Sequence, residues 1–279
     1  MPSKRVRGLV AGATSAAVVA GAVIAIASSS GSPAARSAGA AQSAPAAQAA
    51  SASMAGLYGS LPSAGTPASG GTITMGQISG STPTYIFPII PGADATDGTE
   101  FLTDQLWLPL YNLQVGGSMQ VNYATSAALP PTFSDNDRRV TIKLRPGLDW
   151  SNGKPVTADD VLFDIALLKA AVKESPANYG DYTPGLFPDN TTIATPNAST
   201  FVVNFSKSYN QNFDLFAQLD VLQPLPAHAW AKTSLTGPIV PFDNMASATA
   251  IYNFLVAQAK DPKTYGTNPL WQVVDGPYK

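Results

Sequence analysis

The stretch VTIKLRPGLDWSNGKPVTADDVLFDIALLKA, Val140 to Ala170, contains the signals of a strand, a tight turn and a helix in direct succession. Apolar and polar residues alternate from Val140 to Arg145, which is the period-two pattern of a strand with one buried face. Asn152-Gly153 is a residue pair that readily adopts the positive φ angles of a tight turn. The stretch therefore predicts that α and β structure are mixed in this part of the chain.

The helix in this stretch has a clear start and a clear end. Thr157 is a helix-capping residue, and Asp160 follows three residues later, as in a capping box. An apolar stripe at helical spacing then runs as far as Ser175-Pro176, where proline cannot continue a helix. We expect the polar face of this helix to carry Asp164, Lys169 and Lys173.

The amino-terminal residues have the charge order of an export signal. Lys4, Arg5 and Arg7 precede an uncharged, largely apolar run that ends at Ala27, and Ala25-Ile26-Ala27 offers a small-x-small cleavage site. The run is also long enough to cross about 30 Å of hydrocarbon as an uncleaved helix. Residues 1–27 are therefore predicted to be a signal peptide or a membrane anchor, and either places the protein outside the cell or in its envelope.

Composition divides the rest of the chain into a linker and a folded domain. Residues 28–70 are dominated by Ala, Ser, Gly and Pro, so they offer too little apolar area to offset the entropy of ordering, and we expect a disordered linker. Residues 71–279 hold all 18 acidic residues but 12 of the 16 basic ones. This acidic balance argues against nucleic acid as a partner.

The chain has no cysteine and a single histidine, His228. The absence of cysteine excludes disulfides, thiol catalysis and thiolate metal sites. His228 lies between Pro226 and Trp230, and we expect it to pack at a helix start. The composition thus predicts neither a metal site nor a cofactor.

Other segments extend the alternation of strands and helices. The segment Thr82–Pro91 is apolar but contains three prolines, which favours an extended segment over a central strand. We expect the following further elements: a first strand over 71–77, a helix over 101–108, hairpins turning at 134–137 and 196–199, a short helix from Phe213, and a helix over 246–259 with Ala250, Phe254 and Ala257 buried. The predicted fold class is mixed α/β.

The opening stretch closely resembles the signature region of a known family, the extracellular solute-binding proteins of the peptide and nickel type that serve as receptors of ABC importers. Further segments resemble the family in the family's order: LWLPLYN (106–112), SAALPPTFS (126–134), LFPDN (186–190), PLPAHAW (224–230) and DGPYK (275–279). Together they cover nearly all of residues 71–279.

The resemblance implies a periplasmic-binding-protein-like fold of type II, in which two α/β lobes close on a ligand by a hinge motion. It also implies a receptor without catalytic activity, a monomer that delivers a small peptide or similar solute to an ABC permease in the membrane. Gly276-Pro277-Tyr278 resembles the place where the chain enters the second lobe. We therefore expect residues 71–279 to be the first lobe, as an amino-terminal fragment of the whole receptor.

Four residues are predicted to contact the ligand. Tyr85 and Phe87 belong to the proline-broken segment, which resembles the early ligand-facing segment of the family, while Tyr111 offers another ring and Asn112 a polar contact. The sequence does not identify the ligand, because half of the expected contacts belong to the other lobe.

Two other functions remain open at this point. Ser151-Asn152-Gly153-Lys154 fits the S-x-x-K motif of an exported serine hydrolase or acyl-transferase, although Asn-Gly predicts a turn where that chemistry needs a helix start. An uncleaved amino-terminal helix would instead suit an anchored cell-surface interaction protein. We expect no catalytic residue.

Overall fold

A computed structural model of the protein describes residues 70–72, 74, 76, 79–114 and 120–277. The chain separates into two units, Met1–Gly56 and Leu57–Lys279, and the described residues belong to the second. The predicted signal or anchor (1–27), almost the whole predicted linker (28–70) and much of the predicted first strand (71–77) lie outside the described residues. In the part that is described, no helix is long and apolar enough to cross a membrane.

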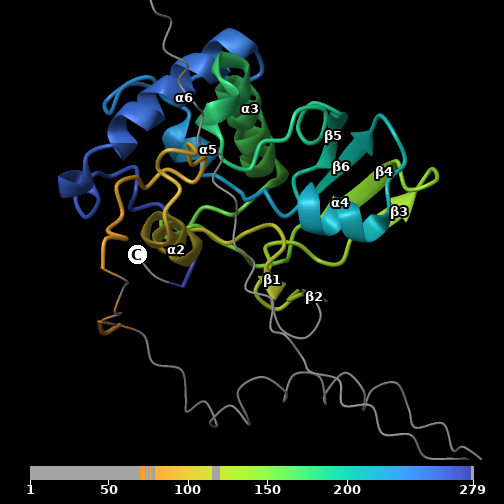
Figure 1. Ribbon diagram of the computed structural model, residues 1–279, viewed down its shortest axis with the longest axis horizontal. Coiled ribbons are helices and arrows are strands. Elements are labelled where there is room, and N and C mark those ends of the chain that lie inside the picture. The colour runs from red at the N-terminus through yellow and green to blue at the C-terminus, as the bar shows by residue number, and fades with distance from the viewer. Residues whose placement is uncertain (1–69, 73, 75, 77–78, 115–119, 278–279) are drawn as a thin grey trace, which may run out of the picture. The chain divides into compact units, whose positions relative to one another are not determined.

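The centre of the β structure is an antiparallel sheet of four strands in the order β3-β4-β6-β5 (Figure 1). These strands are β3 Thr132–Ser134, β4 Arg139–Lys143, β5 Thr191–Asn197 and β6 Thr200–Phe205. Both predicted hairpins are confirmed, because β3 pairs with β4 and β5 pairs with β6. A second, two-stranded sheet consists of β1 Leu113–Gln114 and β2 Gln120–Val121.

The register between β4 and β6 puts apolar side chains opposite each other on one face. Val140 pairs with Val203 and Ile142 with Phe201, and all four side chains are fully buried. Alternate residues of β4 point away from this face, as the period-two pattern predicted.

Helix α3, Ala158–Glu174, begins and ends where the sequence predicted. Asp160 Oδ2 accepts hydrogen bonds from the Thr157 backbone N at 2.8 Å and from its Oγ1 at 3.2 Å, which closes the first turn. The helix stops before Pro176, which begins a short 3-10 helix, Pro176–Asn178.

One prediction about α3 is wrong. The sequence predicts that Asp164 lies on the polar face, but the residue is 2% exposed, and its Oδ2 accepts a hydrogen bond from the backbone N of Gln223 at 3.1 Å. The loop after α4 covers this part of the helix, and helical spacing alone contains no information about such a cover. Burial raises the pKa of the Asp164 carboxyl well above its ordinary value.

The other helices are α2 Asp97–Leu106, α4 Gln211–Ala217, α5 Ala227–Trp230, α6 Met245–Ala259 and the 3-10 helix Pro262–Thr264. Of these, α5 and α6 contact α3, while α4 lies beside the four-stranded sheet (Figure 1). Helix α2 begins four residues before the predicted start at Phe101, because Thr96 Oγ1 accepts a hydrogen bond from Thr99 N at 3.2 Å and caps it there. Of the predicted short helix from Phe213, the part beyond Ala217 is not helical.

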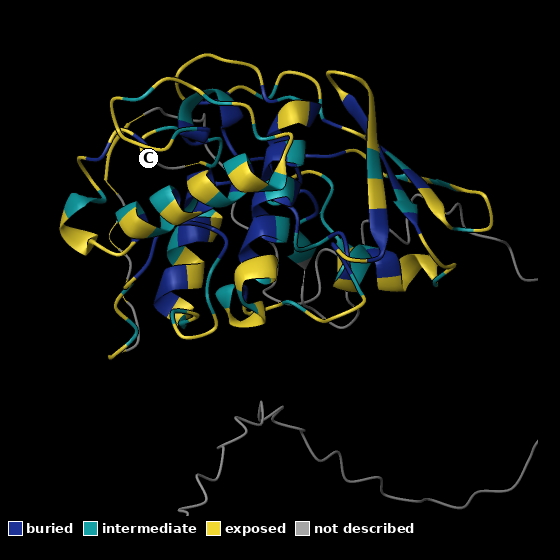
Figure 2. Cartoon of the chain, turned by 90° about the horizontal axis from the view of Figure 1, so that it is seen from above, coloured by how far each residue is buried: buried dark blue, intermediate teal, exposed yellow. Residues whose placement is uncertain are grey.

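Helix α6 packs against α3, with a buried face different from the predicted one. Figure 2 shows helices with one buried and one exposed side. In α6, Ala250 and Ala257 are exposed and Phe254 is half-buried, so the predicted inner stripe is wrong. The buried residues are Ala248, Ile251, Tyr252, Leu255 and Ala259. The predicted face and the observed face of α6 both have helical spacing, so only packing against α3 decides which one is buried.

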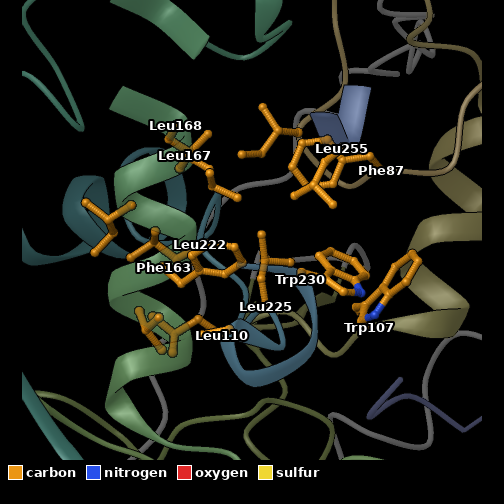
Figure 3. Close-up of a cluster of buried hydrophobic side chains, with 14 of the residues drawn as sticks. Phe87, Trp107, Leu110, Phe163, Leu167, Leu168, Leu222, Leu225, Trp230 and Leu255 are labelled. Atoms are coloured by element: carbon orange, nitrogen blue, oxygen red, sulfur yellow. The ribbon is translucent and has the colours of Figure 1, made fainter. Parts of the chain in front are cut away.

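Aromatic rings fill the core where α2, α5 and the chain end near residue 271 meet (Figure 3). Trp230 contacts both Trp107 and Trp271 edge to face, with ring centroids 5.3 and 5.2 Å apart. The buried ring nitrogens also find partners, since Trp107 Nε1 donates to Val273 O and Trp230 Nε1 to Leu270 O. This cluster joins segments that are more than 150 residues apart.

The corrected face of α6 leads to a stability prediction. Leu255→Ala removes a fully buried side chain and should lower the free energy of unfolding by about 3 kcal/mol, because it leaves a cavity. Val256→Ala is the matched control on the neighbouring, half-buried position and should cost less than about 1 kcal/mol. Urea denaturation measures both, and equal losses would contradict the assigned face.

Candidate functional site

A cavity of about 230 Å³ opens where four segments of the chain meet. The segments are the proline-broken stretch 82–91, helix α2, the loop after α3 and the loop after α4. Their lining residues include Pro88 and Ile90, then Glu100, Thr103 and Asp104, then Tyr179, Gly180 and Asp181, and finally Asp220, Val221, Leu222 and Gln223. The cavity thus collects residues from widely separated parts of the sequence.

Backbone hydrogen bonds hold two of these segments together. Gly180 N donates to Ile90 O at 2.9 Å, and Gly92 N donates to Ala177 O at 3.1 Å. A Cβ atom at Gly180 would lie 3.5 Å from the Gly92 Cα, which is an ordinary van der Waals contact, so the two segments lie side by side at these glycines. The stretch 82–91 is therefore fixed by the loop after α3 and not by sheet pairing.

The opposite wall of the cavity is fixed by α3 and by the segment after α2. Leu110 N donates to Leu222 O at 2.7 Å, and the buried Asp164 accepts from Gln223 N. The loop after α4 therefore has its position set by two independent anchors.

The cavity is acidic. Glu100, Asp104, Asp181 and Asp220 line it, and none of its lining residues is basic. Burial, and then the negative charge of Asp181, raises the pKa of Asp220 to about 6. Burial also raises the pKa of Glu100, with smaller contributions from Asp181, Asp104 and Asp97. Like charges that raise one another's pKa values would be stabilised by a positively charged group among them.

Tyr179 adds a neutral hydrogen-bonding group to this wall. Its side chain is 8% exposed, and burial, followed by the charges of Asp181, Asp164 and Asp220, raises the pKa of its phenol well above the ordinary value. Among the residues that the structure describes, no group of three or more His, Cys, Asp or Glu has the arrangement of a metal site. The four carboxyls and the Tyr179 phenol that line the cavity suit an ammonium or guanidinium group, because their oxygens accept hydrogen bonds from such a group.

The four predicted contact residues do not line this cavity. Tyr85 and Phe87 are 0% exposed and Tyr111 is 1% exposed, all within the hydrophobic core, while Asn112 is half-buried. Tyr111 packs edge to face on Tyr123. The predicted contact of these four residues with a ligand stays a prediction.

Tyr85 differs from the other core rings in one respect. Its hydroxyl is buried and has no hydrogen-bond partner among the described residues, whereas the Tyr111 hydroxyl donates to Leu129 O at 3.4 Å. Burial raises the pKa of Tyr85 far above its ordinary value, so the group is a neutral phenol. An unpaired buried hydroxyl is unfavourable, and so its removal should not destabilise the fold.

Sequence reasoning found one wall of the cavity and missed the rest. The three prolines drew attention to the stretch 82–91, which contributes Pro88 and Ile90. The acidic residues come from three separate places, Glu100 and Asp104 from α2, Asp181 from the loop after α3 and Asp220 from the loop after α4, and nothing in the local sequence marks them as a group. Their only signal in the sequence is the excess of acidic over basic residues in 71–279.

The residues of the hydrolase alternative have structural partners. Ser151 Oγ donates to Gln272 O at 2.8 Å and is 3.2 Å from Val274 N, from which it accepts. Ser151 and Lys154 flank a turn in which Gly153 has a φ of +77°, so the lysine does not follow the serine by one turn of helix. His228 lies at the start of α5, as predicted, 2.9 Å from Asn152 Nδ2.

Part of the sequence matches a known protein family. Residues 122–279 match the model of the bacterial extracellular solute-binding proteins, family 5, middle region. The match covers more than half of the chain, so the chain belongs to this family. The described helices and sheets agree with the predicted mixed α/β class, and family membership agrees with the prediction of a solute-binding protein. No curated protein matches the sequence.

Solved structures of this kind resemble the chain at low sequence identity. The oligopeptide-binding protein AppA from Bacillus subtilis, in complex with a nonapeptide, is 17% identical over 71% of this chain and 31% of its own, with a TM-score of 0.44. The oligopeptide-binding protein from Thermus thermophilus, complexed with a pentapeptide, is 19% identical over 71% and 33%, with a TM-score of 0.44. NikZ from Campylobacter jejuni, in complex with Ni(L-His), is 17% identical over 73% and 31%, with a TM-score of 0.39. The chain spans about a third of the length of these proteins.

The buried carboxyls predict how stability depends on pH. Burial raises the pKa values of Asp214 and Asp220 to about 6 and that of Asp275 to about 7, above the values of an unfolded chain. The folded protein therefore holds protons that the unfolded chain releases, so stability falls as pH rises through these folded-state pKa values. The melting temperature should be higher at about pH 5 than at about pH 8.

A variant tests the contribution of the cavity to this effect. Asp220→Asn cannot ionise, so the difference in melting temperature between the two pH values should shrink. Asp159→Asn removes an exposed carboxyl and should leave the difference unchanged. Calorimetric scans measure the three proteins, and a wild-type protein that is more stable at the higher pH would contradict the prediction.

Proposed function

We propose that the protein is the extracellular substrate-binding component of an ABC import system. It captures an oligopeptide-like solute and delivers it, as a monomer, to the permease subunits in the membrane. The observation that carries this proposal is the match of residues 122–279 to an extracellular solute-binding family. The order of charged and apolar residues in 1–27 supports export, either by a signal peptide that is cleaved or by an uncleaved helix that tethers the protein.

Within this function, the acidic cavity is the proposed place for a positively charged group of the solute. Four carboxyls line it without a basic neighbour, and binding of an amino group would lower the cost of keeping them ionised. A peptide brings such a group at its amino terminus. The side chains of Lys and Arg offer the same chemistry.

The predicted contact residues join this proposal through the segment that they share. Pro88 and Ile90 line the cavity, and Tyr85 and Phe87 hold the same segment from the core side. The unpaired hydroxyl of Tyr85 would gain a partner in a solute, and Tyr111 and Asn112 extend the proposed contact region beyond Pro109. Because none of these four residues lines the cavity, their contact with a solute is tested separately from the role of the cavity.

Calorimetry with peptides tests the function. The protein expressed from its full reading frame should bind a short oligopeptide saturably, and acetylation of the peptide amino group should weaken binding by about tenfold or more, as expected for the loss of a charge-assisted hydrogen bond. Asp220→Asn should reduce this preference for the free amino group. Absence of saturable binding to any peptide of a mixed library would contradict the function, whereas equal binding of both forms would contradict only the role of the cavity.

A conservative variant tests Tyr85. Tyr85→Phe keeps the ring and removes the unpaired hydroxyl, so the free energy of unfolding should stay the same or rise by about 1 kcal/mol. If the hydroxyl contacts the solute, affinity should fall in the same variant. Tyr111→Phe is the matched control for stability, since its hydroxyl has a backbone partner. Unchanged peptide affinity in Tyr85→Phe would remove Tyr85 from the site.

A further inference from the structure

The segment 272–277, near the end of the described chain, is held between two other segments. On one side, Trp107 Nε1 donates to Val273 O at 3.1 Å, and Gly276 N donates to Leu106 O at 2.9 Å. These bonds fix the segment to the residues that end α2. The segment has no strand of its own in the sheet, so these contacts replace sheet pairing.

On the other side, Ser151 makes three hydrogen bonds to the same segment. Its backbone N donates to Val274 O at 2.7 Å, and its Oγ accepts from Val274 N and donates to Gln272 O. The serine hydroxyl thus acts as both donor and acceptor. These hydrogen bonds give Ser151, the first residue of the Ser151–Lys154 turn, a structural role.

The segment 272–277 packs tightly against the end of α2 at Gly276. A Cβ atom at Gly276 would lie 2.5 Å from Gln105 O and 2.7 Å from Leu106 O, which is closer than atoms can approach. Only glycine allows this contact without a shift of the backbone.

Asp275 is the ionisable residue of the segment 272–277, and the residue as a whole is half-buried. Its Oδ1 accepts a hydrogen bond from Leu108 N at 3.0 Å, while its Oδ2 is buried and has no partner among the described residues. Gln105–Leu108 and Trp150-Ser151, which contact the segment, contain no ionisable side chain. The charged group that acts on Asp275 is Asp160 of α3, which carries the same sign of charge.

We propose that Asp275 is a proton-controlled positioning residue, which holds the segment 272–277 firmly when its carboxyl is neutral and loosens it when the carboxyl ionises. A neutral carboxyl keeps the hydrogen bond from Leu108 N and places no charge on the buried Oδ2 atom. Backbone hydrogen bonds from Leu108 N and from Asp275 itself favour the ionised carboxyl, but burial outweighs them and Asp160 opposes the charge. Because Oδ2 has no partner among the described residues, the ionised carboxyl gains free energy if water enters. Burial raises the pKa of Asp275 to about 7, so the change falls in the neutral range.

The role of Asp275 does not depend on the proposed function, although it bears on it. In a two-lobed receptor, the segment would set the direction in which the chain leaves this lobe, and mild acid would make that direction more rigid. Hydrogen exchange measures this role without any solute, so its outcome is separate from that of the peptide-binding experiment.

Amide hydrogen exchange, followed by NMR on the full chain, tests the proposal. The protection factors of the Leu108, Val274 and Gly276 amides should fall roughly tenfold or more between about pH 5.5 and about pH 8.5, after correction for intrinsic exchange. In Asp275→Asn, whose side-chain oxygen can still accept from Leu108 N, the same factors should not depend on pH. Asp159→Asn, with its exposed carboxyl, should behave as the wild type.

Ser151→Ala distinguishes the hydrogen bonds that hold the segment 272–277 from the effect of Asp275 protonation on that segment. It removes the bonds of the hydroxyl, so protection of the Val274 amide should fall at both pH values while the pH dependence at Leu108 persists. Wild-type protection that is equal at both pH values overturns the proposal, even if Asp275→Asn fails to fold. A pH dependence that persists in a folded Asp275→Asn overturns it as well.

Discussion

The rest of the structure depends on the hydrogen bonds that the buried carboxylate of Asp160 accepts. Asp160 is 3% exposed and accepts hydrogen bonds from Thr157 N and Oγ1, from Trp150 Nε1 at 3.3 Å and from Ala227 N at 3.0 Å. One side chain therefore fixes the start of α3, the turn before it and the start of α5. Burial raises its pKa, and these hydrogen bonds lower it in part, since they favour the ionised form.

Asp164 repeats this arrangement one helical turn later. Its carboxyl binds the backbone of Gln223, in the same loop whose end Asp160 binds at Ala227. The loop after α4 is thus held at two points by one face of α3, and residues 220–223 of this loop line the acidic cavity. The geometry of the candidate site therefore depends on two aspartates that do not line it.

The tryptophan cluster joins this scaffold to the segment 272–277. Trp107 and Trp230 contact Trp271 and donate to backbone oxygens near it, so the segment is held by packing as well as by hydrogen bonds. The same cluster contains Phe87, whose ring lies 5.9 Å from that of Trp230. The stretch that lines the cavity and the stretch that contains Asp275 thus pack into one core.

The sequence by itself determined the local structure of this protein. Alternation fixed β4, the Thr157–Asp160 capping box and Pro176 fixed both ends of α3, and the turn residues fixed both hairpins, because each of these signals acts over a few neighbouring residues. The tertiary structure alone decided that Asp164 is buried, that α6 uses the face of Ile251 and Leu255, and that the rings of Tyr85 and Phe87 belong to the core. It also decided which carboxyls line the cavity, because Glu100, Asp181 and Asp220 come together only when α2 and two distant loops pack against each other.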